Sequence, residues 1–116
     1  MNDSEFEHAI EMLRSTDAIT YEEAYHWLQG DNLKRYIPEI VDLLDKEEDP
    51  DVRAKLVELV GDADLEKYIP VLVRELSHAS REVRLWAYNQ LSLSSHEEAK
   101  EQAATYQRSH PDEDFY

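Results

Sequence analysis

Residues 33–41 read LKRYIPEIV, and residues 65–73 read LEKYIPVLV, a recurrence at an offset of 32 residues. A second segment follows each copy, one residue sooner the second time: VRAKLVELV at 52–60 matches VRLWAYNQL at 83–91. A weaker copy of that second segment, TYEEAYHWL, stands at 20–28. Self-similarity at this period is typical of helical repeats that stack into a solenoid.

Each unit reads as two helices joined by a polar turn. Apolar residues recur at steps of three and four, which is the spacing of one helical face. In one unit they are Ile37, Ile40, Val41 and Leu44, then Val52, Leu56, Leu59 and Val60. Asp49 and Pro50 in the intervening turn suit the cap and the first position of the second helix. Gly30 and Gly61 are expected to end second helices in the left-handed conformation.

These patterns predict an all-α fold, an α-solenoid of about three helix pairs plus a C-terminal capping helix. We expect one domain over residues 1–108, with repeats at about 4–30, 33–61 and 65–92 and the capping helix at 95–108. Residues 109–116 read as a flexible acidic tail. Pro38 and Pro70 either open the first helix of their unit or kink one that began earlier, and the pattern does not choose between these.

The composition points to a folded protein with an acidic surface. Acidic side chains number 27 against 12 basic ones, for a net charge of -15, while 41% of residues are hydrophobic and regularly spaced. Such a charge repels nucleic acid and anionic membranes and favours a basic protein partner. We therefore expect no nucleic-acid or membrane partner, and a chain that is monomeric when free.

Absent residue types and segments exclude several kinds of site. Without cysteine the chain has no disulfide, thiolate metal site or thiol nucleophile, which fits a cytoplasmic location. The first residues show no signal peptide, and no apolar run approaches the roughly 18 residues of a membrane span. No phosphate-binding glycine loop or nucleophile motif appears. We expect no enzyme activity and no cofactor.

The second segments carry a family resemblance. They resemble HEAT repeats, especially the bacterial subgroup similar to phycobilisome-lyase repeats. The residues that carry it are Asp49-Pro50-Asp51-Val52-Arg53, Leu56, Val60-Gly61, Val83-Arg84, Ala87 and Leu91. The resemblance implies that Arg53 and Arg84 pair with acidic residues between repeats. Tyr21 replaces this arginine in the first unit, which is the divergent one.

The resemblance also implies a function, because HEAT repeats mostly serve as protein-binding scaffolds. Small bacterial HEAT-like proteins include candidate immunity proteins, which neutralise a toxin by binding it. Our specific expectation is a non-enzymatic, immunity-type inhibitor of a basic toxin or effector. The alternative is an accessory protein that helps attach a chromophore or cofactor, as phycobilin lyases do.

Helical geometry predicts a partner-binding face on the second helices. With Val52, Leu56, Leu59 and Val60 turned inward, the positions next to them turn outward. The predicted contacts are Tyr25, His26, Val57, Glu58, Leu85, Tyr88 and Asn89, together with Asp51 and Glu48 from the acidic stretch at 39–66. Trp27 and Trp86 are expected to pack in the core.

Metal binding is a weaker hypothesis. Glu23 and His26, like Glu5 and His8, have the spacing that di-iron helical bundles use. One HEAT-repeat family, deoxyhypusine hydroxylase, builds a di-iron site from several His-Glu dipeptides. This chain has a single such dipeptide, His96-Glu97, so we expect no metal site.

Overall fold

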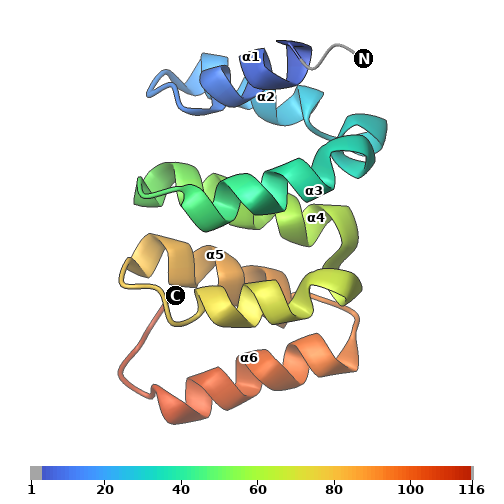
Figure 1. Ribbon diagram of the computed structural model, residues 1–116. Coiled ribbons are helices and arrows are strands. Elements are labelled where there is room, and N and C mark those ends of the chain that lie inside the picture. Colours follow the sequence, from blue (N-terminus) through green and yellow to red (C-terminus); the bar gives the residue numbers. More distant parts are fainter. Residues whose placement is uncertain (1–3, 116) are drawn as a thin grey trace.

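The computed structural model describes residues 4–115, and within them every regular element is a helix. The helices are α1 (Ser4–Leu13), α2 (Ala18–Trp27), α3 (Gly30–Lys46), α4 (Pro50–Glu75), α5 (Arg81–Ser92) and α6 (Glu97–Ser109). They stack one upon another into an elongated body of 45 × 26 × 23 Å (Figure 1). The all-α solenoid expected from the repeats is confirmed.

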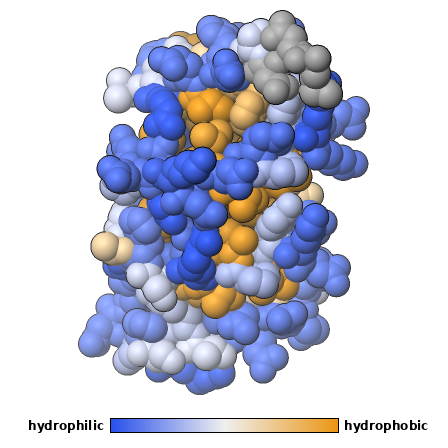
Figure 2. All heavy atoms as spheres, in the orientation of Figure 1, coloured by the Kyte–Doolittle hydropathy of each residue, from blue (hydrophilic) through white to orange (hydrophobic). Residues whose placement is uncertain are grey.

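Figure 1 shows the helices in two layers. One layer holds the first helix of each pair, namely α1, α3, the second arm of α4 (residues 65–75) and α6. The other holds the second helices, namely α2, the first arm of α4 (residues 50–63) and α5. We call the outer surface of this latter layer the second-helix face. Figure 2 looks onto the opposite layer, where patches of hydrophobic surface show between hydrophilic residues.

Aspartates determine where several helices begin. The backbone N–H of Thr20 donates to the Asp17 carboxylate ahead of α2, at 3.1 Å. Asp49 accepts from the N–H of Asp51 at 3.0 Å, and Pro50 is the first residue of α4. Both contacts satisfy donors that the first helical turn leaves unpaired. The predicted cap and proline positions at 49–50 are therefore confirmed.

α4 consists of two helical arms joined at a bend. Asp64 has extended backbone angles (φ -162°, ψ 84°), and its carboxylate accepts from the N–H of Lys67 at 3.3 Å. Asp64 thus caps the second arm as Asp49 caps the first. Pro70 lies near the start of this arm, just beyond the irregular Tyr68 (φ -105°, ψ 15°). Pro38, in contrast, lies inside α3, which already begins at Gly30.

The two glycines have different roles. Gly30 adopts a left-handed φ of 61° just after α2 ends, as its position predicts. Gly61 does not end a helix; it lies inside α4, so that prediction is wrong. A side chain at this position would lie 2.4 Å from the Gln90 side chain of α5. The Gln90 side chain therefore occupies the space that a Cβ at position 61 would take.

The apolar stripes meet between the two layers. The side chains that are fully buried there include Leu13, Leu28, Ile40, Leu44, Leu56, Leu59, Leu72 and Leu91. Of the eight residues predicted on the inward stripes, six are buried, while Ile37 and Val41 are half-buried. The capping helix α6 buries only Ala99 and Ala103, which agrees with its thin apolar content.

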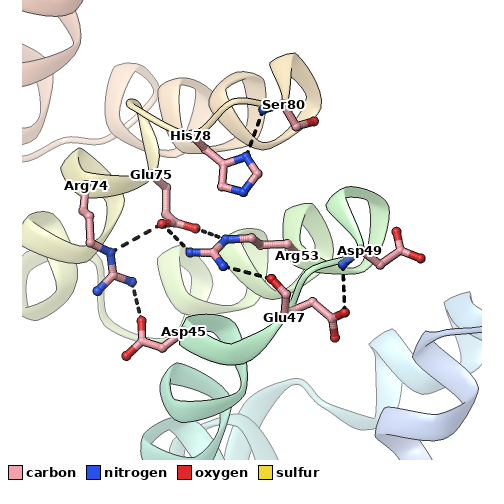
Figure 3. Close-up of polar contacts among 8 residues, drawn as sticks. All are labelled: Asp45, Glu47, Asp49, Arg53, Arg74, Glu75, His78 and Ser80. Carbon is pink, nitrogen blue, oxygen red and sulfur yellow. Dashed lines mark hydrogen bonds and ion pairs between the residues drawn. The ribbon is translucent and has the colours of Figure 1, made fainter.

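A buried ion pair joins the two arms of α4. Arg53, from the first arm, donates through Nε and Nη2 to the Glu75 carboxylate at 2.6 and 2.9 Å (Figure 3). The Glu75 side chain is only 2% exposed. Arg53 Nη1 also donates to the backbone oxygen of Glu47, six residues earlier, at 2.9 Å. The arginine therefore fixes the turn before its own helix and the end of the following arm.

Arg84 repeats this arrangement in the next unit. Its Nη1 donates to the backbone oxygen of His78, again six residues earlier, at 2.9 Å. Its Nε pairs with Glu113, which lies beyond the end of α6. The implied pairing with an acid between repeats is confirmed for Arg53, whereas the acid that pairs with Arg84 lies beyond the last helix. Residues 110–115 consequently fold back toward α5, which differs from the expected flexible tail (Figure 1).

We predict that Arg53→Leu destabilises the protein by up to about 3–5 kcal/mol, because it leaves the buried Glu75 carboxylate with only the longer contact to the half-exposed Arg74. The control Arg74→Leu removes a half-exposed arginine 3.4 Å from the same carboxylate and should cost less than about 1 kcal/mol. Urea unfolding measures both. The double variant Arg53→Leu/Glu75→Leu should recover most of the loss, and equal costs for the two arginines would contradict this account.

We also predict strong coupling between Gly61 and Gln90. Gly61→Ala should displace Gln90, whose Nε2 donates to Glu58 O at 3.1 Å and to Asp62 Oδ1 at 3.2 Å, at a cost of roughly 1–2 kcal/mol. In a Gln90→Ala background the same change should instead stabilise by about 0.5–1 kcal/mol through helix propensity. A double-mutant cycle in urea tests the change of sign.

Candidate protein-binding face

The structure places the predicted contact residues in three different environments. Only some of them lie on an open surface. One is fully buried, five are half-buried, and three are exposed. In the order of the chain they are Tyr25, His26, Glu48, Asp51, Val57, Glu58, Leu85, Tyr88 and Asn89.

Val57 cannot contact a partner, so its prediction is wrong. Its side chain is 0% exposed, and Ala54, one turn earlier, is 3% exposed. The first arm of α4 is an interior element, with α3 and α5 packed against it and Tyr25 of α2 bonded to its Asp62. A helix with neighbours on several sides buries a wider arc than the single stripe seen in its sequence.

Tyr25 belongs to a polar ladder that joins three second helices. Its hydroxyl donates to Asp62 on α4, and Gln90 of α5 donates to the same carboxylate at 3.2 Å. Burial raises the pKa of the Tyr25 hydroxyl, and the bond to Asp62 raises it further. The ring is half-buried. Tyr25 therefore holds the layer together and is not a free aromatic anchor.

Tyr88 is partly covered by the chain's own C-terminal segment. The Phe115 ring lies 5.2 Å from it, centroid to centroid, and the Tyr106 ring of α6 lies at 6.3 Å. Arg81 holds this segment by donating to the backbone oxygen of Asp114 at 2.6 Å. Leu85 and Asn89, on the same helix, are half-buried. Most of the expected apolar stripe is thus packed against other parts of the protein.

The open part of the second-helix face is acidic. His26, Glu48 and Asp51 are exposed, as predicted, and Glu58 is half-buried. Burial raises the pKa of the Glu58 carboxyl, with the charge of Asp62 adding to the effect, while a hydrogen bond from Tyr25 opposes it. This part of the face presents carboxylates and few free apolar side chains.

A groove on this face was missed from the sequence. It encloses about 430 Å³ between the starting turns of α2, the first arm of α4 and α5. Two predicted residues, Asp51 and Glu58, line it. Its other lining residues are Arg14, Ser15, Thr16, Tyr21, Asp49, Val52, Ala54, Lys55, Glu82 and Trp86. Three separate units contribute to it, so no single helix pattern reveals it.

The contact between Trp86 and Glu82 could have been predicted from the sequence. They lie four residues apart on α5, a spacing that puts side chains together on a helix. The Trp86 indole N–H donates to Glu82 at 3.1 Å. Trp86 packs partly against the core, as expected, but it also lines the groove. Trp27 stacks on Tyr36 at 6.0 Å and agrees with its predicted packing role.

The residues considered for metal binding do not converge. Glu5, His8 and Glu23 line a groove of about 580 Å³ between α1 and α2, while His26 is not among its lining residues. Among residues 4–115, no three or more histidine and acidic side chains are placed to hold a metal ion. In the same part of the chain, no helix is both long and apolar enough to cross a membrane.

We predict that Glu58→Gln stabilises the free protein at about pH 7. The folded-state pKa of Glu58 is raised, so ionising it opposes folding above that pKa, whereas below its ordinary value the residue is protonated whether folded or unfolded. The gain should be less than about 1 kcal/mol, since the side chain is only half-buried, and should vanish toward pH 4. Urea unfolding of Glu58→Gln and of the exposed control Glu101→Gln, compared at the two pH values, tests this. A gain that persists at the lower pH contradicts it.

Comparison with known proteins identifies the family. A family model described as HEAT repeats matches residues 6–92 and again residues 37–114. No curated protein and no solved structure gives a significant match. HEAT repeats generally mediate protein–protein interaction. Because the two matched ranges together span nearly the whole chain, this protein belongs to the HEAT repeat family.

Proposed function

We propose that this protein acts by binding a basic protein through its second-helix face, and that it works as an immunity-type inhibitor of a toxin or effector. The observation that supports it most is the set of carboxylates around the 430 Å³ groove. Asp51, Glu58 and Glu82 line this groove, and within residues 4–115 none of them forms an ion pair.

The protein's charge supports a basic partner. A net charge of -15 draws a basic protein in from a distance, which raises the association rate more than the final affinity. The carboxylates on the second-helix face then provide local contacts for cationic side chains. An inhibitor needs no catalytic groups of its own, because occupying the toxin surface is sufficient.

The role of this face is tested by paired charge reversal. Asp51→Lys/Glu82→Lys changes two groove residues, while Glu98→Lys/Glu101→Lys makes the same charge change on exposed positions of α6. Proteins captured from the native host would be identified, and their association with each variant measured at low and high salt. We expect the groove pair to lower the association rate at least tenfold and the α6 pair to lower it far less.

Two outcomes contradict the proposal. Equal losses for both pairs would mean that overall charge matters and the second-helix face does not. No loss for either would remove the basic partner. For the inhibitor role itself, the captured protein should lose its activity when the wild-type chain is added in equimolar amount, and unchanged activity would leave binding without inhibition.

A further inference from the structure

The groove on the second-helix face has an excess of unpaired negative charge. Its two cations are already engaged: Arg14 pairs with Glu47 at 2.6 Å, and Lys55 donates to the backbone oxygen of Leu13 at 3.1 Å. Asp49 is occupied as the cap of α4. The remaining carboxylates line the groove without an ion pair in the described part of the chain, and they are Asp51, Glu58 and Glu82.

The groove also has aromatic walls. Tyr21 comes from α2 and Trp86 from α5, and both side chains are half-buried. The Lys55 ammonium already lies 3.8 Å from the centre of the Tyr21 ring, so one aromatic face here binds a cation. The hydrogen bond from the Trp86 indole to Glu82 holds a second ring beside a free carboxylate oxygen.

We propose that this groove receives an arginine side chain of the basic partner. Its guanidinium stacks on the Trp86 indole and donates to the carboxylates of Glu82 and Asp51. Arginine fits better than lysine because its planar group can stack on a ring and donate two parallel hydrogen bonds to a carboxylate. This inference rests on the proposed function, since it specifies what the second-helix face recognises.

Two features of the groove together favour arginine, and neither a solvated acidic surface nor a core tryptophan requires both. Acidic residues alone would attract any cation, including a salt ion. The indole ring adds a flat surface that favours a flat, weakly hydrated cation. The local cation, Lys55, occupies the Tyr21 side of the groove and leaves the Trp86 side open to a partner.

The test uses short peptides of alternating glycine with arginine, lysine or the neutral arginine analogue citrulline. Binding is followed by NMR through the indole N–H resonances of the two tryptophans. We expect the arginine peptide to shift the Trp86 signal in a saturable manner and to shift Trp27 far less, because the Trp27 ring is already stacked on Tyr36. Citrulline should give no saturable shift, and lysine should bind more weakly than arginine.

Matched variants locate the contacts. Asp51→Asn/Glu82→Gln should weaken arginine-peptide binding roughly three- to tenfold, as expected for two exposed charge pairs, whereas Glu98→Gln/Glu101→Gln should change it by less than twofold. Trp86→Phe should also weaken binding, because phenylalanine binds cations less well than tryptophan does. This variant lacks the reporter indole, so its affinity and that of the wild type are compared by isothermal titration calorimetry. Circular dichroism confirms that each variant remains folded before it is compared.

The arginine site is overturned if arginine and citrulline peptides bind alike, if the shifts map away from Trp86, or if both neutralised pairs weaken binding equally. It is also overturned if no peptide shifts Trp86. None of these results decides the proposed function, which depends on the charge-reversal experiment with the host partner. If charge reversal abolishes partner binding while the peptides show no preference for arginine, the second-helix face stands as the binding surface and the arginine site is rejected.

Discussion

Much of this structure depends on one interaction, the ion pair made by an arginine near the start of a second helix. This arginine is Arg53 in the second unit and Arg84 in the third. Arg53 reaches back to the turn before its helix and forward to the buried carboxylate of Glu75. A carboxylate that is 2% exposed tolerates burial only when a cation and hydrogen bonds replace its lost solvation. The pair therefore fixes the bend at Asp64 and the position of one repeat on the next, which brings three second helices into a single face.

The same requirement explains both ends of the stack. Arg84 lacks an acidic partner at the end of α6, which is the first helix that follows it. Glu113, beyond the end of α6, supplies the carboxylate. That pairing brings residues 110–115 back and covers part of Tyr88 with Phe115. In the first unit, Tyr21 stands in place of the arginine, and Leu43 occupies the position equivalent to Glu75 at the repeat offset of 32. Both members of the ion pair are replaced together, so neither is left as an unpaired buried charge.

Some polar groups of the second-helix layer lie between packed helices, and others lie on its open surface. The ladder of Tyr25, Asp62 and Gln90 satisfies polar groups where helices touch, and Gly61 allows that close contact. Near the helix starts the layer opens into a groove whose carboxylates have no ion-pair partner among residues 4–115. The protein's aromatic side chains mostly serve its own packing, while its free charge faces outward. On this face the exposed carboxylates support the proposed recognition of a basic partner.

The sequence by itself determined the helix pairs, their period, the cap at Asp49 and the inward stripes. These features are local, because helical spacing and capping depend on residues a few positions apart. Only the tertiary structure decided that Val57 is buried, that Tyr25 is bonded to Asp62, and that Tyr21 and Trp86 share one groove. The physical reason is that apolar spacing along a helix identifies only its most apolar face. The width of the buried arc depends on how many neighbouring helices pack against it. The placement of Tyr21 and Trp86 around one groove is set by stacking three units, and no local pattern encodes it.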